Sequence, residues 1–334
     1  VFPMSLRPQA HEIIRTWAFY TIVRAHYHDG ALPWANVAVS GWGLSPDGAA
    51  KLSKSKGGGP IGALAALDKY SADAVRYWAA GAGLGKDTII SEERIATGGR
   101  WVTKLWNVAR FAERFLGGYT PPAAPPAGLT TADRWLLARL AHLTAAATAA
   151  FEAYDYATVR GEVETFFWRD LADNYIEMAK QRLYAGEAGY ESARYTLYHA
   201  LLATLKLLAP LLPYVTEAIY GGLFAAADGA PSVHRAAWPT ADARFDDPLA
   251  LTAGDALLDI ATAVRRYKSE HGLSLGAELA ALRLPDAPPE LAAALREATA
   301  DLLSITRARA LLFDGAPNGH GERLTAGRIE VVVE

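Results

Sequence analysis

The segment from residue 37 to residue 60 constrains the fold of this chain most. Val37–Ser40 has the apolar composition of a buried β-strand and runs into a turn. Residues 51–59 then read Lys-Leu-Ser-Lys-Ser-Lys-Gly-Gly-Gly, and Pro60 is suited to the first position of a helix. A strand, a basic glycine-rich loop and a helix in this order are typical of a phosphate site in an α/β domain.

The basic loop itself favours contact with polyphosphate. Lys51 and Lys54 lie three positions apart, next to small hydroxyl residues. A loop that closes over a nucleotide would bring both ammonium groups to the negative charge that develops on phosphate. A basic linker exposed to solvent is the alternative, because short basic motifs recur by accident. The surrounding motifs decide between the two interpretations.

Two linked motifs resemble those of the class I aminoacyl-tRNA synthetases. Residues 51–55 are similar to the second signature of that family, Lys-Met-Ser-Lys-Ser, with leucine in place of methionine. Residues 70–78 resemble the Tyr-Gly-Ala-Asp-Ala-x-Arg segment that follows the signature in the subgroup for branched aliphatic amino acids. The resemblance implies that Lys51 and Lys54 are catalytic. It also implies that ATP, accompanied by Mg²⁺, is bound by Lys51, Leu52, Ser53, Lys54 and Ser55.

Within the subgroup, residues 7–20 most resemble the valine-specific enzymes of archaeal type. This resemblance implies that Glu12 lies near the amino group of the amino acid or the ribose, and that Ile13 and Trp17 line the side-chain pocket. Positions 13 and 17 are four apart and share a helix face. A core stripe on an amphipathic helix is the alternative. An isoleucine-specific enzyme also remains open, since it would keep the loop and change this helix.

The first signature of the family, His-x-Gly-His, does not occur in the sequence, and the chain opens with Val1. We therefore expect the C-terminal portion of a longer enzyme that activates valine with ATP and transfers it to tRNA(Val). This portion would be inactive alone. A tRNA-binding module without catalysis is the alternative from another functional class, and the intact loop argues against it.

Composition limits the partners and cofactors. The 334 residues are 51% hydrophobic, enough for two or three domains with cores, and the net charge of -3 gives no global attraction to nucleic acid. There is no cysteine, which excludes disulfides and thiolate zinc sites, and the histidines show no ligand spacing. The most apolar stretch, residues 197–215, is interrupted by Lys206 and two prolines, so we expect a core helix, no membrane contact and a cytoplasmic protein. We also expect a monomer, and no heptad pattern is long enough for a coiled-coil arm.

Four regions are predicted along the chain. Residues 1–90 would be the second half of a Rossmann-like catalytic domain, with strands at 1–5 and 37–40 and a helix at 12–26. Residues 91–120 would be a helical stem-contact segment. Residues 121–228 would be an anticodon-binding helix bundle, and residues 229–334 a small α/β appendage. The expected elements of these last two regions are a helix that Thr131 caps, helices at 156–184, 190–208, 211–226, 257–267 and 291–303, and strands at 281–284, 308–313 and 329–333.

Candidate tRNA contacts lie in the second and third regions. After the Gly98-Gly99 pair, a helix to Leu116 would align a basic stripe of Arg100, Lys104, Arg110 and Arg114. Residues 104–111 resemble the stem-contact segment of the family, and a plain solvated helix face is the alternative. The anticodon candidates are Arg160, Phe167 and Arg169, in a bundle that would read splayed bases. A further cluster, Arg265, Arg266 and Lys268, fits tRNA contact or a solvated helix end equally well.

Overall fold

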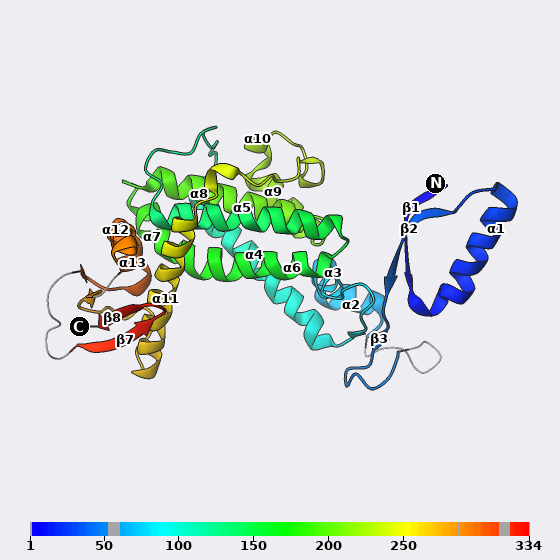
Figure 1. The fold of residues 1–334 in the computed structure, drawn as a ribbon, viewed down its shortest axis with the longest axis horizontal. Helices are drawn as coiled ribbons and strands as arrows, with labels where there is room; N and C mark the ends of the chain where they lie inside the picture. Colours follow the sequence, from blue (N-terminus) through cyan, green and yellow to red (C-terminus); the bar gives the residue numbers. More distant parts are fainter. Residues whose placement is uncertain (1, 53–60, 187, 286–287, 314–320, 334) are drawn as a thin grey trace. The chain divides into compact units, whose positions relative to one another are not determined.

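The computed structural model describes residues 2–52, 61–186, 188–285, 288–313 and 321–333. These residues are mostly helical, with short strands in small sheets (Figure 1). The chain divides into two compact units. Unit 1 comprises Val1–Asn107, Ala146–Glu162 and Leu208–Glu217, and unit 2 comprises Val108–Ala145, Val163–Leu207 and Ala218–Glu334.

Unit 1 begins with a parallel pair of strands. β1 (Met4–Ala10) pairs with β2 (Trp34–Ser40) in a register that runs from Met4 opposite Trp34 to Ala10 opposite Ser40. The strand expected at residues 1–5 therefore lies further along the chain, because its partners are the residues of β2. The strand expected at 37–40 is confirmed and is longer. It is not buried as expected, since Val37 is 42% exposed in a sheet of two described strands.

The connection between these strands is helical. It consists of a 3₁₀ turn η1 (His11–Ile13), a π turn η2 (Ile14–Ala18) and α1 (Phe19–Asp29). The helix predicted at 12–26 is thus present, but its first two turns are not α-helical. A second parallel pair joins β3 (Gly43–Leu44) to β4 (Thr88–Ile89). The doubly wound sheet predicted for residues 1–90 stays a prediction, since the described strands there form only these two pairs.

Gly98 and Gly99, which we expected to precede a helix, lie inside that helix. α4 runs from Glu92 to Leu116 and passes through Gly98 and Gly99. A Cβ built on Gly98 would lie 2.5 Å from the carbonyl oxygen of Ala74, in α3 (Ala72–Ala80). Glycine is needed here because two helix backbones approach closely, and this packing offsets its poor helix propensity. The prediction failed because the approach is a tertiary contact.

α3 also anchors a distant segment of unit 1. The buried carboxylate of Asp73 accepts hydrogen bonds from the backbone amides of Val215 (2.6 Å) and Tyr214 (3.3 Å), at the start of α9 (Pro213–Leu223). The Arg76 guanidinium donates to the carbonyls of Leu211 (3.0 Å) and Pro210 (2.8 Å). A carboxylate at a helix N-terminus satisfies free amides and complements the helix dipole. Asp73 and Arg76, both in the segment at 70–78, therefore hold the backbone of residues 210–215 in place.

The helices of the predicted bundle are confirmed in the middle of the chain. They are α5 (Thr131–Glu152), α6 (Tyr156–Thr165), the π segment η4 (Phe166–Tyr175), α7 (Ile176–Ala185) and α8 (Tyr190–Leu208). The helix expected at 211–226 is divided into α9 and α10 (Ala225–Asp228). The cap of α5 is Thr130 rather than Thr131. The Thr130 hydroxyl accepts from the Asp133 amide (3.3 Å), and Asp133 accepts from the Thr130 amide (3.0 Å), a reciprocal capping box.

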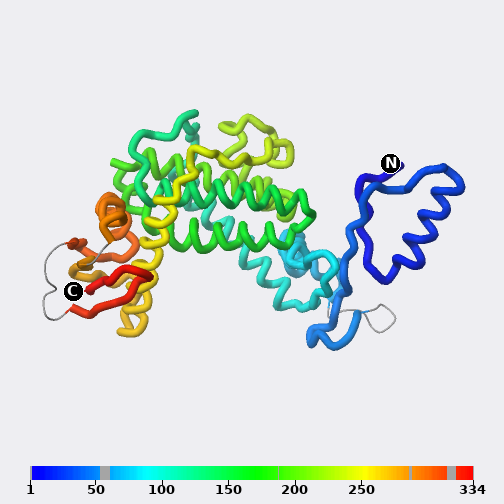
Figure 2. The backbone as a smooth tube through the Cα atoms, viewed as in Figure 1, coloured from blue at the N-terminus to red at the C-terminus, as the bar shows by residue number. Residues whose placement is uncertain are grey.

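The C-terminal part of unit 2 is a small α/β layer beside a long helix. α11 (Pro248–Glu270) contacts the antiparallel pair β7 (Glu322–Ala326) and β8 (Ile329–Val333) (Figure 2). The sheet order is β6-β5-β8-β7, with β5 (Leu282–Arg283) parallel to β6 (Leu311–Leu312). β7 was not predicted, and the helix expected at 291–303 is divided into α12 (Pro289–Glu297) and α13 (Thr299–Thr306). The helix at 257–267 is confirmed and is longer.

The basic cluster near the end of α11 is largely structural. The ammonium of Lys268 is buried and donates to three carbonyls, those of Leu275 (3.1 Å), Ala277 (2.6 Å) and Thr306 (2.9 Å). Arg265 donates to the Asn174 side chain at 2.9 Å. A lysine with three carbonyl partners has no donor left for a phosphate. Arg266 is the exposed member of the cluster.

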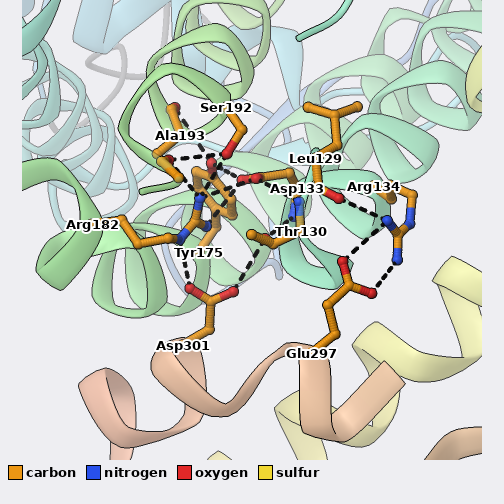
Figure 3. Close-up of polar contacts among 11 residues, drawn as sticks. Leu129, Thr130, Asp133, Arg134, Tyr175, Arg182, Ser192, Ala193, Glu297 and Asp301 are labelled. Atoms are coloured by element: carbon orange, nitrogen blue, oxygen red, sulfur yellow. Dashed lines mark hydrogen bonds and ion pairs between the residues drawn. The ribbon is translucent and has the colours of Figure 1, made fainter. Parts of the chain in front are cut away.

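A buried ionic network joins the bundle to the C-terminal layer (Figure 3). Arg182 in α7 donates two parallel bonds to Asp133 in α5 (3.0 Å each) and one to Asp301 in α13 (2.8 Å). The Tyr175 hydroxyl donates to Asp133 at 2.6 Å, and burial raises the pKa of Tyr175 well above its usual range. Burial also raises the pKa of Asp301 to about 6, although Arg182 opposes this rise. The network is therefore paired but poorly solvated.

We predict that Ser71→Gly stabilises unit 1 by about 1–2 kcal/mol. Ser71 lies between α2 (Ala63–Tyr70) and α3 at φ 77° and ψ 157°, a region that is almost restricted to glycine. Its hydroxyl accepts a long bond from the Ala74 amide (3.4 Å), and replacing such a cap by glycine costs only a few tenths of a kcal/mol. Denaturant unfolding measures the change. Ser71→Ala, which keeps the strain and loses the cap, is the control and should destabilise.

We predict that the stability advantage of Asp301 over Asn grows as the pH falls from about 6 to about 4. The native pKa of about 6 lies above the ordinary value of 3.8, so the folded protein holds this proton more tightly than the unfolded chain. The contribution is present in full below the ordinary pKa and is lost as the pH rises through 6. Its size is on the order of 3 kcal/mol. Unfolding of both proteins at several pH values tests this, and an advantage that shrinks in acid would mean that Asp301 is ionised throughout.

Candidate active site

The carboxyl ends of β1 and β2 create one edge of unit 1. Because the strands are parallel and in register to their last pair, Ala10 opposite Ser40, the chain leaves both strands at the same edge. His11 and Glu12 follow β1, and Trp42 follows β2 after one intervening residue. Ligands of open α/β sheets bind at this edge. The polar and aromatic side chains that follow the strands are therefore the candidate site.

Glu12 and Lys51 form an ion pair at this edge, although they are 39 residues apart. The Lys51 ammonium lies 5.1 Å from the centre of the Trp42 ring, in cation–π geometry. The His11 ring is 4.7 Å from Trp42, and its Nδ1 is 3.3 Å from the Ser40 carbonyl oxygen. The side chains of Lys51 and Glu12 are 36% and 39% exposed, so both remain accessible to a ligand.

The start of the basic loop is fixed against β3. Lys51 forms a β-bridge with Leu44, and the Leu52 amide donates to the Gly43 carbonyl at 2.9 Å. The loop therefore enters the site at a defined place. The remaining members of the predicted ATP-binding segment, Ser53, Lys54 and Ser55, lie outside the described residues.

The predicted pocket residues lie on the irregular turns after β1. Ile13 is half-buried at the end of η1, and Trp17 is 56% exposed within the π turn η2. The Arg7 guanidinium lies 5.2 Å from the Trp17 ring and 5.8 Å from the Trp34 ring. Trp17 is therefore not buried within the described residues, and its place in a side-chain pocket stays a prediction. Short π turns often occur at functional sites.

A close backbone approach positions Trp42. A Cβ on Gly41 would lie 2.3 Å from the backbone carbonyl of Lys86, and the Trp42 amide donates to Asp87 at 2.7 Å. The Trp42 carbonyl in turn accepts from the Thr88 amide at 2.8 Å. Sequence reasoning noted the turn after Ser40 but missed Trp42 and His11 as site residues. Their position directly after paired parallel strands was the signal.

The candidate tRNA residues of α4 are distributed over both units. Arg100, which donates to the Thr97 hydroxyl at 2.9 Å, and half-buried Lys104 belong to unit 1. Exposed Arg110, and Arg114, whose guanidinium lies 3.5 Å from the Tyr184 hydroxyl, belong to unit 2. Their role in binding tRNA stays a prediction.

The three anticodon candidates differ in accessibility. Arg160 stacks 4.3 Å from the centre of the Tyr77 ring and is half-buried, and Arg169 donates to Asp170 at 2.7 Å. Phe167 is fully buried, so its ring fills the core and offers no face to a nucleotide base. This corrects the expectation for Phe167. An aromatic residue at helical spacing is more often a core residue, and the sequence does not show which side of η4 faces inward.

The described part of the chain was searched for metal-binding clusters and for membrane-spanning helices. Within it, no group of three or more His, Cys, Asp or Glu side chains is arranged to hold a metal ion. None of its helices combines the length and the apolar character that crossing a membrane requires.

Comparison with known proteins identifies the family. Residues 1–91 match the family model "tRNA synthetases class I (I, L, M and V)", and residues 133–283 match "Anticodon-binding domain of tRNA ligase". The chain is 44% identical over 277 residues to the valine–tRNA ligase of Anaplasma marginale, covering 82% of this chain and 33% of that protein. It is 43% identical over 280 residues to the enzyme of Thermococcus kodakarensis, covering 83% of this chain and 31% of that protein.

A solved structure shares the fold. This structure is the ternary complex of Agrobacterium radiobacter K84 agnB2 LeuRS with tRNA and LeuAMS. The match covers 73% of the present chain and 29% of the matched chain of the complex, with a TM-score of 0.54 and 16% sequence identity. The sequence matches place the chain in the class I tRNA synthetase family, and the curated relatives that it matches are named valine–tRNA ligases. The chain spans about one third of the length of the curated relatives it matches.

We predict that Gly41→Ala destabilises unit 1 by about 1–3 kcal/mol, because the added methyl group collides with the rigid backbone of Lys86 rather than with a side chain. Gly161→Ala in α6, where no atom apart from the neighbouring residues and the backbone of its own helix lies within 4 Å of the added Cβ, is the matched control and should stabilise slightly. Denaturant unfolding measures both. Equal effects of the two substitutions would show that the backbone at Gly41 moves aside freely.

Proposed function

We propose that this chain is the part of a valine–tRNA ligase that carries the second signature loop and the anticodon-binding domain. The whole enzyme would activate valine with ATP and transfer the valyl group to the 3′ end of tRNA(Val). The observation that best supports this function is the meeting of Glu12 and Lys51 at the carboxyl ends of β1 and β2. The valine–tRNA ligase relatives support the choice of reaction.

The proposed chemistry requires positioning and charge more than covalent help. A carboxylate oxygen of valine attacks the α-phosphorus of ATP, the bond from that phosphorus to the bridging oxygen breaks, and pyrophosphate leaves. Lys51 and Lys54 would neutralise the charge that develops on the phosphates. Glu12 would bind the amino group or the ribose, while Ile13 and Trp17 would contact the valine side chain. Residues 1–90 would then form the second half of a Rossmann-like catalytic domain.

The Glu12–Lys51 pair suggests how the two side chains are held in place before substrate binds. A partly exposed pair contributes no more than about 1 kcal/mol, so it exchanges readily for other partners. Triphosphate would draw the Lys51 ammonium away, and the same step would free the Glu12 carboxylate for a cationic or hydroxyl group. One exchange would therefore prepare both groups for substrate. Mg²⁺ would enter as part of the ATP substrate, held by phosphate oxygens, and we propose no protein-bound zinc.

The remaining regions would serve tRNA. We propose residues 91–120 as the stem-contact segment, 121–228 as the anticodon-binding bundle and 229–334 as the appendage. Arg100, Lys104, Arg110 and Arg114 would contact phosphates, and Arg160 and Arg169 would lie near the anticodon. A protein with these substrates would work in the cytoplasm, and we propose a monomer.

Two alternatives are separated by activity. An isoleucine-specific enzyme would support pyrophosphate exchange with isoleucine in preference to valine. A non-catalytic tRNA-binding module would bind tRNA and exchange with neither. We expect the full-length protein to exchange with valine, because residues 7–20 and the relatives both favour the valine-specific enzyme.

We predict that Lys51→Ala and Lys54→Ala in the full-length protein each slow adenylate formation on the order of 10²–10³-fold, with little change in the concentration dependence on valine. These groups act on charge that develops in the transition state, so their loss reduces the rate constant. Lys69→Ala is the control. It removes one positive charge as well, but from a lysine that pairs with Glu92 and does not lie at the edge formed by β1 and β2. Pre-steady-state measurement over a range of valine and ATP concentrations decides. An unchanged rate, or a defect limited to valine affinity, would reject the assignment of the loop.

A further inference from the structure

A pocket of about 630 Å³ lies in unit 2 between α5 and α8, and it includes no residue of the proposed active site and none of the candidate tRNA contacts. Its volume is typical of a small-molecule site. Leu137 and Leu140 of α5 and Leu202 of α8 are among its apolar lining residues. Residues 239–245 form another wall of the pocket and are called the strap below.

The charged side chains of the lining are paired with one another. The Lys206 ammonium lies 2.8 Å from the Asp228 carboxylate, and the Arg244 guanidinium lies 2.6 Å from the Asp242 carboxylate. Burial lowers the pKa of His199, which also lines the pocket, to about 4, so its imidazole is neutral at neutral pH. The pocket therefore has no excess positive charge for a phosphate chain, and a neutral ligand fits it better.

Two phenol groups in the pocket have no protein partner. Tyr195 and Tyr198 lie one turn apart on α8, and each residue is only 2% exposed. Among the described residues, neither hydroxyl has a hydrogen-bond partner. Burial raises the pKa of Tyr195, and it raises the pKa of Tyr198 to about 12, so both groups stay protonated and can donate. A buried hydroxyl without a partner costs about 1–3 kcal/mol, so an acceptor inside the pocket would be favourable.

Ring contacts hold these phenols in fixed positions. The Tyr195 ring lies 4.2 Å from the His199 ring, and the Tyr198 ring lies 5.1 Å from the Phe224 ring. A donor that is already held in place loses little conformational freedom when a ligand binds. Together with Phe245 and the prolines at 121, 122 and 239, the rings also give the pocket flat apolar surfaces. Such surfaces pack well against a flat ring.

The strap closes the pocket without being tied to the helices. Among the described residues, 239–245 form no hydrogen bond with α5 or α8. Asp242 instead accepts from the backbone amide of Arg244 (3.0 Å) and from its guanidinium, within the strap itself. The nearest ion pair to a helix joins the exposed side chains of Asp246 and His142 at 3.5 Å. The strap can therefore move to admit a ligand without breaking a hydrogen bond to either helix.

We propose that this pocket binds a neutral, flat heteroaromatic molecule. Its ring atoms accept hydrogen bonds from the hydroxyls of Tyr195 and Tyr198, and its faces contact the leucines and Phe245. The site goes beyond the proposed function and does not depend on it, because it uses neither the edge formed by β1 and β2 nor the candidate tRNA residues.

Quinoline and naphthalene are suitable probes, because they have the same shape and differ by one ring nitrogen that accepts a hydrogen bond. Each is titrated into the full-length protein at neutral pH, with excess ATP to occupy a nucleotide site, and the Kd is measured by calorimetry. The double variant Tyr195→Phe/Tyr198→Phe should weaken quinoline binding about threefold to tenfold, the value of one hydrogen bond, and leave naphthalene binding within about twofold.

The melting temperature of the same double variant should stay equal or rise, since hydroxyls without a protein partner contribute nothing to stability. Tyr214→Phe is the matched control, because Tyr214 is 67% exposed and does not line the pocket, and it should bind both probes like the unchanged protein. Failure of the unchanged protein to bind quinoline would overturn the proposal. Equal changes for both probes in the double variant would also overturn it, as would a clear loss of stability, which would show that the hydroxyls have protein partners.

Discussion

The Arg182 guanidinium is the interaction on which unit 2 depends. Its bonds reach Asp133 in α5 and Asp301 in α13, and so connect helices that are far apart in the sequence. Removing such charges from water is costly, and the pair is favourable only because each partner finds several hydrogen bonds. What the network provides is a fixed placement of α13 on the bundle.

Unit 1 depends on a comparable polar contact that involves fewer charged side chains. Asp73 and Arg76, on consecutive turns of α3, fix the backbone at 210–215 through amides and carbonyls rather than through side chains. Backbone partners place no demand on the identity of residues 210–215, apart from the turn that the prolines favour. This explains why two motifs that look unrelated in the sequence belong to one structural arrangement. The candidate active site is built differently, from side chains that follow the ends of β1 and β2.

Sequence reasoning succeeded where the signal is local. Apolar periodicity placed α8 at its observed bounds, and strand composition located β2 and β8. Glu12 and Lys51, which the motifs suggested as site residues, form an ion pair, and their roles stay predictions. The neighbouring Trp42 and His11 were missed because their proximity comes from strand register. Phe167 was misjudged because burial depends on which side of η4 meets the core. Gly98 was placed before the helix rather than inside it, because the close approach that requires glycine there involves Ala74 in another helix.

The sequence by itself determined the family, the order of α/β and helical regions, and the chemical identity of the basic loop, because these depend on residue type and short-range spacing. Only the tertiary structure decided which charges remain available. Lys268 and Arg265 are consumed by carbonyl and amide partners, while Arg307 remains exposed, and nothing in the local sequence separates them. The physical reason is that the free energy of a charge depends on the polar groups and the solvent around it, and those are brought together from distant parts of the chain only on folding.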